Sequence, residues 1–429
     1  MFSVLRTPKL GRVWAGQFVS MVGDGVYAIT VSLYLLPRAD AAQALGTLLA
    51  ATALGSIITL IFGGAVADRV RRSLVVCAAD LLRIVGVAAL LLAGPDAPIA
   101  VLAVLGAVFG CGAGIHRPAY TALIAQLAGR DKRREASALR SATSRFTGIV
   151  GPVIGGSVAA ASSPRWGLVI NILTFVFSLA TLVRLDEPDV SSVKAGPDGP
   201  DGPDGPDGKA KPGLVREALD GIGYVRGQKW MIGVMLQGTA QAALVIAPMA
   251  VVVPIVMGGR GPAALSLVTS ATACGALAAT LTASRIRSRR PGTVAMLGLL
   301  CELPQIVAVA VDAPTAWVVA LSALAGAGAS VFAVLWGAAL QERTPDHMLG
   351  RVYALDALLT QALMPLCVAA AGFLLGVLSA SAIAGFAACA LLLTVVAVLP
   401  VPGVAMLGSA TADEEPDRTP HDQKPAGRA

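Results

Sequence analysis

The sequence predicts an all-α integral membrane protein in which twelve transmembrane helices form two pseudo-symmetric six-helix bundles. Composition is the first reason: 55% of the 429 residues are hydrophobic, 14% are charged, and the mean hydropathy is +0.74. A soluble protein of this length could not bury so much apolar surface. The second reason is a succession of apolar runs near the roughly 20 residues that cross a bilayer as a helix. The third is that basic residues gather after every second run.

Charged residues, prolines and glycines bound the apolar runs and so define the predicted spans. We expect twelve of them, at 12–36, 43–66, 74–93, 98–117, 141–161, 166–184, 230–256, 262–283, 292–311, 315–337, 354–377 and 379–400. Several are longer than the hydrocarbon core is thick, so these helices are expected to tilt or to extend past the membrane surface.

The basic residues also predict an orientation. Lysine and arginine precede the first span and follow the second, fourth, sixth and eighth, whereas the opposite side has only Arg38, Arg165 and Arg260. Because cytoplasmic loops retain lysine and arginine, we expect a multi-pass protein with both termini in the cytoplasm.

A Gly-Pro-Asp repeat at 196–208 separates the two halves. The repeat has no apolar side chains to bury and cannot form a helix or a packed strand. We therefore expect an N-terminal six-helix bundle at 1–184, a disordered cytoplasmic linker at 185–212, a C-terminal six-helix bundle with a leading amphipathic segment at 213–407, and a loose cytoplasmic tail at 408–429.

The two halves resemble each other in sequence. The charged segment 64–72 has a weaker counterpart at 280–290, and Gly151-Pro152 corresponds to Met364-Pro365 at nearly the same spacing. This indicates an ancient duplication. Two related bundles joined by a loose linker suit alternating access, in which the halves rock about a site near the bilayer midplane.

The charged loop after the second span has the pattern Gly64-x-x-x-Asp68-Arg69-x-x-Arg72. Together with twelve spans divided in the middle, it resembles the major facilitator superfamily. The stretch Gly148-Ile-Val-Gly151-Pro152-Val-Ile-Gly155-Gly156 resembles the fifth-span motif of its drug–proton antiporters. Further segments resemble the branch that holds macrolide-efflux proteins and the enterobactin exporter: Gly23-Asp24, Arg117-Pro118, residues 134–139 and residues 341–352. The resemblance implies a bacterial inner-membrane exporter.

Two acids lie deep in predicted spans. Asp24 is near the middle of the first span, where a charge costs roughly 3 kcal/mol, so it should face the bundle interior or a wet cavity. It is a candidate for carrying a proton or pairing with a cationic substrate; the alternative is a structural carboxylate. Glu302 is a second candidate for a carboxylate that carries a proton or contacts the substrate; the alternative is that it pairs with a neighbour and only fixes helix packing. It precedes Pro304, which is expected to bend the ninth span.

Four glutamines are candidates for substrate contact. Gln237 and Gln241 stand one turn apart and share a face of the seventh span. They can hydrogen-bond a polar substrate or join neighbouring helices. Gln17 and Gln361 are further candidates of the same kind.

A cytoplasmic gate is predicted at the charged loop. Asp68 could accept hydrogen bonds from the N-terminus of the eleventh span, or pair with Arg351, when the cytoplasmic side is closed. Asp80 and Arg83, three residues apart, can neutralise each other and extend the gate, or form a plain ion pair. The alternative for the loop arginines is that they only set topology. The candidate gate residues are Gly64, Asp68, Arg69, Arg72, Asp80, Arg83 and Arg351.

The fifth-span glycines and proline have two interpretations. Gly148, Gly151, Pro152, Gly155 and Gly156 allow a helix to bend and a neighbouring backbone to approach closely. The antiporter resemblance implies a bend that keeps the cavity sealed against leak. Tight helix packing alone would use the same residues.

Several function classes are excluded by what the sequence lacks. There is no phosphate-binding loop for ATP, no catalytic Ser/His/Asp or His-Glu-x-x-His pattern, and no cysteine spacing for a metal. We expect no enzyme, no cofactor, no metal and no nucleic-acid partner.

The predicted function is secondary active transport by a monomer in the lipid bilayer: proton-coupled efflux of amphipathic small molecules such as antibiotics or siderophores. A proton-coupled importer of a nutrient or metabolite, or a non-transporting membrane sensor, is the alternative.

Overall fold

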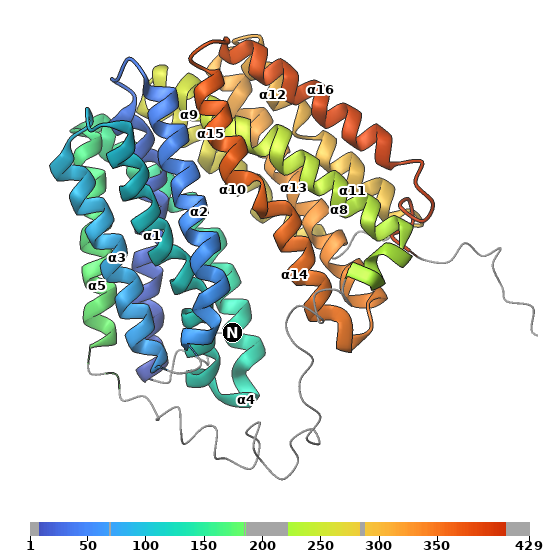
Figure 1. Ribbon diagram of the computed structural model, residues 1–429, viewed down its shortest axis with the longest axis horizontal. Helices are drawn as coiled ribbons and strands as arrows, with labels where there is room; N and C mark the ends of the chain where they lie inside the picture. The colour runs from blue at the N-terminus through green and yellow to red at the C-terminus, as the bar shows by residue number, and fades with distance from the viewer. Residues whose placement is uncertain (1–7, 68–69, 184, 186–221, 284–287, 409–429) are drawn as a thin grey trace, which may run out of the picture.

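The computed structural model describes residues 8–67, 70–183, 185, 222–283 and 288–408. Every regular element in these residues is a helix, as the sequence predicts (Figure 1). The N-terminal helices are α1 (Pro8–Leu35), α2 (Ala41–Ala67), α3 (Arg72–Ala93), α4 (Ile99–Ala161) and α5 (Pro164–Leu182). The C-terminal helices are α8 (Lys229–Gln241), η2 (Ala242–Ile246), α9 (Ala247–Gly259), α10 (Pro262–Ala283), α11 (Pro291–Leu300), α12 (Leu303–Ala310), α13 (Thr315–Arg343), α14 (Asp346–Ala362), α15 (Met364–Leu374) and α16 (Ala380–Val398).

Eleven helical segments of the described chain are long and apolar enough to cross a membrane. The remaining predicted span, 141–161, is the second arm of α4. The loop predicted between 117 and 141 is wrong, because α4 stays helical up to Gly129, where φ is 70°, and is helical again directly after it. Hydropathy marks the part of a helix that lies in lipid, whereas the helix itself can continue into water.

Three predicted spans contain interruptions. Between α8 and α9 the helix widens into the π-helical turn η2, and Cys301 and Glu302 separate α11 from α12. The bend expected at Pro304 is therefore confirmed. A proline has no N–H for the preceding turn, so helices break just before it. Pro365 stands in the same position as the second residue of α15, and Leu363 separates α15 from α14, which ends at Ala362.

The two groups of helices meet at one end of the molecule and diverge toward the other (Figure 1). We call the first the closed end; its connections are 36–40, 94–98, 162–163, 260–261, 311–314 and 375–379. We call the second the open end; it includes 70–71, Gly129, 288–290 and 344–345. Contacts between the groups join α2 to α15 and α4 to α10. Gly46 lies against Gly372 and Gly156 against Ser266, both nearer the closed end.

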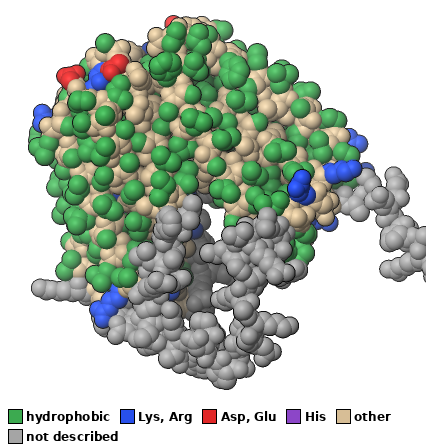
Figure 2. Space-filling model, in the orientation of Figure 1, with side chains coloured by type: hydrophobic (Ala, Val, Ile, Leu, Met, Phe, Trp, Pro, Cys, Tyr) green, Lys and Arg blue, Asp and Glu red, His purple; other side chains and the backbone are tan. Residues whose placement is uncertain are grey.

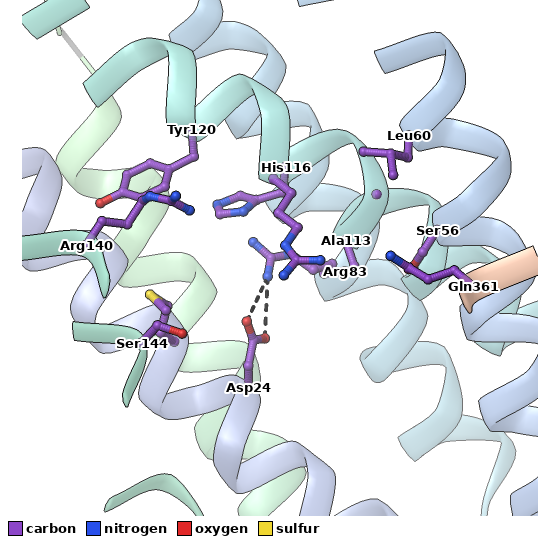
Figure 3. Close-up of a pocket in the computed structure, with 13 residues that line it drawn as sticks. Asp24, Ser56, Leu60, Arg83, Ala113, His116, Tyr120, Arg140, Ser144 and Gln361 are labelled. Atoms are coloured by element: carbon purple, nitrogen blue, oxygen red, sulfur yellow. Dashed lines mark hydrogen bonds and ion pairs between the residues drawn. The ribbon is translucent and has the colours of Figure 1, made fainter. Parts of the chain in front are cut away.

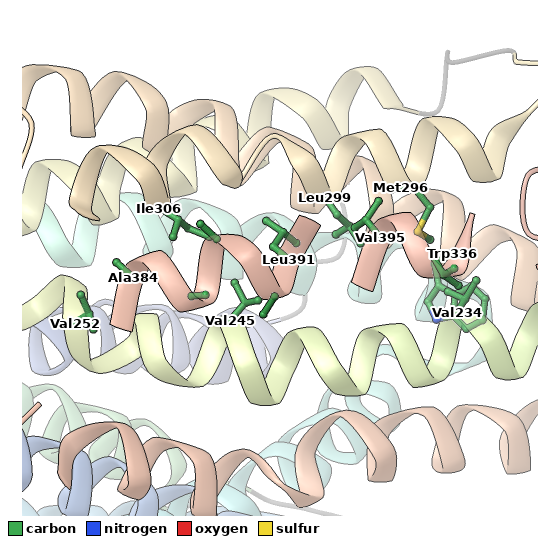
Figure 4. Packing of buried hydrophobic residues seen from close by; sticks show 14 of the residues in the cluster. Val234, Val245, Val252, Met296, Leu299, Ile306, Trp336, Ala384, Leu391 and Val395 are labelled. Carbon is green, nitrogen blue, oxygen red and sulfur yellow. The ribbon is translucent and has the colours of Figure 1, made fainter. Parts of the chain in front are cut away.

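Apolar packing holds the C-terminal helices around α16. Ala384, Leu391 and Val395 of α16 have no exposed surface. They pack against residues of the surrounding helices, among them Val245, Val252, Met296, Leu299 and Ile306 (Figure 4). On the outer surface, hydrophobic side chains cover the middle of the face in view while charged side chains lie toward the two ends (Figure 2). A lipid-exposed belt has this distribution.

Two arginines fasten the connections of the closed end. Arg38 Nη1 donates to the carbonyls of Pro95 and Ala97, at 2.6 and 2.9 Å, and its Nε and Nη2 donate to Asp40. In the other half, Arg260 Nη1 donates to the Ala313 carbonyl at 2.7 Å, and Arg260 forms an ion pair with Asp312. Arg38 thus joins the loop before α2 to the loop before α4, and Arg260 joins the loop before α10 to the loop before α13. Two of the three arginines expected opposite the basic loops have the same local role.

Most of the predicted linker and all of the predicted tail after Gly408 lie outside the described residues, as do 214–221 of the amphipathic segment. Residues 222–227 are helical. The domain boundaries at 184, 212 and 407 therefore stay predictions.

Candidate functional site

A cavity of about 360 Å³ lies between α1, α2, α3, α4 and α14 (Figure 3). Its polar lining comprises Asp24, Ser56, Arg83, His116, Arg117, Tyr120, Arg140, Ser144 and Gln361. Three of the predicted site residues, Asp24, Arg83 and Gln361, thus face one cavity, although Gln361 comes from the other half of the chain. In the space-filling view a hollow separates the two groups of helices on the side away from the closed end (Figure 2).

Asp24 is the acid that lines this cavity, and Arg83 is its partner. Arg83 Nη1 donates to the two carboxylate oxygens of Asp24 at 3.2 and 3.4 Å. The Asp24 side chain is 41% exposed whereas that of Arg83 is 3% exposed. Asp24 therefore presents its carboxylate to the cavity, with a buried cation behind it.

A second carboxylate holds Arg83 from the opposite side. Asp80 is fully buried and forms the predicted ion pair with Arg83. It also accepts a hydrogen bond from Ser178 Oγ at 2.6 Å, and Ser178 in turn accepts one from Gln17 Nε2 at 2.9 Å. The Arg83 guanidinium lies 4.3 Å from the centre of the Phe175 ring. Two charges, a hydrogen-bond chain and a cation–π contact fix its orientation.

Close packing of α1 on α5 makes this network possible. A Cβ at Gly23 would lie 2.0 Å from Thr174 Oγ1, so only glycine allows the approach. The approach brings Gln17 of α1 to Ser178 of α5, while Asp24 of α1 faces Arg83 of α3. The Gly23-Asp24 pair thus combines a packing residue with a charged residue.

One wall of the cavity is basic and aromatic. His116 Nε2 lies 4.0 Å from Asp80 Oδ1, and the His116 ring stacks on Tyr120 at 5.6 Å between centroids. Arg117 and Arg140 also line the cavity, from the two arms of α4. Among the described residues, the side chains of Arg117 and Arg140 have no acidic partner within ion-pair distance.

The C-terminal half has a smaller polar cluster at its helix breaks. Gln241 Nε2 donates to Glu302 Oε2 at 3.2 Å, and Gln237 Nε2 donates to Gln241 Oε1 at 3.1 Å. Gln237 and Gln241 are buried, and Gln241 directly precedes η2. Glu302 also lines a crevice of about 250 Å³ between α9, η2 and α12, together with Gln305. These three predicted residues therefore meet each other, apart from the Asp24 cavity.

The structure describes only some of the predicted gate residues. Asp68 and Arg69 lie outside the described residues, and Gly64 belongs to the last turn of α2. Arg72 Nη1 donates to Gln126 Oε1 at 2.9 Å, and Arg351 Nη1 contacts Met348 Sδ at 3.5 Å. The gate as a whole stays a prediction, while Asp80 and Arg83 belong to the network behind Asp24.

The fifth-span motif lies between the two halves. Gly151 and Gly155 pack on α1, with a Cβ at Gly151 only 2.7 Å from Gly25 Cα. Gly156 packs on Ser266 of α10 and Gly148 faces Ala273. Pro152 lies inside α4, where the helix continues. The contacts are those of close packing, and the sealing role implied by the resemblance stays a prediction.

Sequence reasoning missed part of the cavity wall. Arg140 falls in a segment predicted as a cytoplasmic loop, where arginines are expected to set topology. Tyr120, in the wall, and Ser178, behind it at Asp80, have no local pattern that marks them; only their contacts do. Continuation of the helix past residue 117, with Arg117 and Tyr120 one turn apart, is the signal that would have indicated the wall.

No group of three metal-ligating side chains occurs among the described residues, and the six cysteines are free. Cys274 and Cys389 are exposed. The remaining four are partly buried.

The family model described as Major Facilitator Superfamily matches residues 13–301. This chain belongs to the major facilitator superfamily. Curated relatives include the enterobactin exporter EntS of Salmonella choleraesuis (strain SC-B67) and that of Shigella flexneri. Each is 26% identical over 362 residues and covers 82% of both chains. The chain is thus a multi-pass membrane transporter of a superfamily that moves small molecules, and not an enzyme.

Solved structures with the same fold include the nucleoside transporter NupG, with a TM-score of 0.72 at 12% identity over 91% of this chain and 98% of that one. A bacterial homologue of the iron transporter ferroportin, in its inward-facing state, has a TM-score of 0.66 at 15% identity over the same shares. At these identities the likeness shows the major facilitator fold alone.

Proposed function

We propose that this protein is a proton-coupled exporter of amphipathic small molecules, such as siderophores or antibiotics, that works by alternating access. The observation that carries the proposal is Asp24: a carboxylate that lines the cavity and is backed by a buried arginine with a second carboxylate. An ionisable side chain inside a transmembrane bundle is by default a functional-site hypothesis. The relatives named enterobactin exporter support the outward direction.

The geometry lets Asp24 gain and lose a proton without disrupting the fold. When Asp24 is ionised, Arg83 is shared between Asp24 and Asp80. When Asp24 is protonated, Arg83 keeps its contact with buried Asp80. A buried arginine left without a partner would be strongly destabilising, so the second carboxylate makes the two protonation states compatible with one framework.

We place the open end at the cytoplasm. Arg72, Arg289 and Arg290 are at this end, consistent with the retention of basic residues on that side. The cavity would then load substrate from the cytoplasm. Rocking of the two groups of helices about the midplane would open the closed end and release the substrate outside.

The test is a comparison of variants in a bacterial host that lacks its own efflux pumps. Susceptibility and accumulation of a compound panel are measured for the native protein, for Asp24→Asn and for Asp96→Asn. Asp96 is an exposed acid between α3 and α4, outside the cavity, and serves as the matched control.

We expect the native protein and Asp96→Asn to lower accumulation of at least one compound, with proton release from everted vesicles on its addition. Asp24→Asn should lose both effects while it reaches the membrane in the same amount. Increased accumulation would indicate import instead. No change with any compound would refute transport of amphipathic drugs.

A further inference from the structure

The basic wall of the cavity bears on the chemistry of the substrate. Three arginines line the cavity, and Asp24 is the one acidic side chain in its lining. Arg83 is neutralised by Asp24 and Asp80. Arg117 and Arg140 have neither an ion pair nor a side-chain hydrogen bond with any described residue. Two positive charges at the wall are thus available to a ligand.

Their place in the cavity lining separates them from the arginines that set topology. Arg117 and Arg140 lie on the two arms of α4, at nearly equal distances before and after Gly129. At the rise of an α-helix this is about 17 Å from the turn at the open end. The arms lie together there, because Tyr120, Ala136 and Arg140 share a small pocket. Arginines that only fix orientation belong at the membrane surface, whereas these two line the cavity together with Asp24, Arg83 and His116.

We infer that the cavity takes an organic anion, held by Arg117 and Arg140 against the His116–Tyr120 pair. Figure 3 shows Arg83 and Asp24 in the middle, between Arg140 with Tyr120 on one side and Ser56 with Gln361 on the other. Guanidinium groups are suited to carboxylate, phenolate or phosphate groups, which they bind with paired N–H donors. The inference rests on the proposed function in that it uses the same cavity. It adds that a cationic drug is disfavoured there.

Outward transport of an anion agrees with the proposed direction. The membrane potential is negative inside, so it favours the exit of a negative charge. Because Arg117 and Arg140 hold the anion, Arg83 stays available to Asp24. Substrate binding then does not require Asp24 to give up its partner.

The test uses two dyes with the same xanthene core and opposite charge. Fluorescein, an anion, and rhodamine 6G, a cation, are titrated by fluorescence anisotropy against the full-length protein in phosphatidylcholine nanodiscs, with empty nanodiscs subtracted. We expect fluorescein to bind more tightly, and its binding to weaken as salt is raised. Arg117→Gln and Arg140→Gln should each weaken it about tenfold, the value of one charged hydrogen bond.

Two further variants keep the result interpretable. Arg140→Lys retains the charge but not the paired N–H donors, so it should bind fluorescein more tightly than Arg140→Gln and less tightly than the native protein. Arg165→Gln removes an exposed arginine near the closed end, outside the cavity, and should leave fluorescein binding unchanged.

Tighter binding of rhodamine 6G, equal binding in the Arg117→Gln and Arg140→Gln variants, or no binding of either dye would overturn the inference. Proton release dependent on Asp24 is measured separately, so the proposed transport function can survive any of these results.

Discussion

Replacing Gly46 or Gly372 with alanine should shift the protein away from the conformation seen here. These glycines bring α2 and α15 together near the closed end. A Cβ at Gly46 would lie 2.7 Å from Gly372 Cα, and one at Gly372 would lie 2.6 Å from the Ala42 carbonyl oxygen. Carbon atoms pack at 3.5–4.0 Å, so the helices must separate by about 1 Å. Overpacking of this kind costs about 1–3 kcal/mol.

That cost applies only in the conformation in which α2 and α15 are in contact at the closed end. If the halves rock as proposed, α2 and α15 are apart in the alternative state and the added methyl is harmless there. The equilibrium should therefore move about 5- to 150-fold toward opening of the closed end. The double variant should add little to either single one, because both methyl groups separate the same two helices.

The assay is the distance distribution between spin labels at exposed Ala39 and Val377, in a background without the native cysteines, by double electron–electron resonance. Longer distances should be populated in Gly46→Ala and Gly372→Ala. Gly337→Ala is the control, because a Cβ there meets no atom within 4 Å. An unchanged distribution in both variants, with the protein still folded, would refute the proposed opening at this contact.

Substitutions at three more positions have defined outcomes in thermal unfolding of the detergent-solubilised protein. Asp80→Asn should be destabilised more than Asp24→Asn, on the order of 3 kcal/mol, because Asp80 is the buried partner of Arg83; equal melting temperatures would contradict this. Glu302→Gln should unfold near the native temperature, since glutamine still accepts from Gln241, whereas Glu302→Ala should lose about 1–3 kcal/mol by leaving that donor unsatisfied. Arg38→Gln should lower the melting temperature at pH 7 but less at acid pH. Arg38 lowers the pKa of Asp40, so their interaction stabilises the fold above the ordinary aspartate pKa and is lost as the pH falls through the lowered one.

Most of the fold was predictable because lipid imposes a simple rule on the sequence. Each helix must be apolar over the hydrocarbon core, so the number and approximate position of the spans could be predicted from hydropathy. What happens outside the core, or within a span, follows other rules. The continuation of α4 to Gly129 lies beyond the apolar run. The π-helical turn at Ala242–Ile246 comes just before Pro248, which has no N–H for the Leu244 carbonyl, but a proline alone does not distinguish a π-helical turn from a break.

The sequence predicts several of the individual site residues, but it does not predict which of them contact one another across helices. The spacing of Asp80 and Arg83 on one helix predicts their ion pair, because side chains three apart are neighbours. The contact of Arg83 with Asp24 joins residues 59 apart in sequence and depends on how α1 packs against α3 and α5. A single sequence does not contain that information. For the same reason the sequence predicts Arg83 as a gate residue, whereas the structure places it in the cavity lining beside Asp24.

The contacts themselves support the duplication that the sequence indicates. In each half, a side chain of the first span bonds to one of the third: Asp24 to Arg83, 59 residues apart, and Gln241 to Glu302, 61 residues apart. The closed-end arginines repeat as well, since Arg38 and Arg260 each bind a carbonyl just before the fourth span of their half. The two halves therefore share the position of the link between the first and third spans, but the side chains that form the link differ. The N-terminal link is a charged pair open to the cavity, and the C-terminal link joins a carboxylate to a neutral amide. Under the proposed function the proton is bound at the N-terminal link, because that link is the one that lines the large cavity beside a buried arginine.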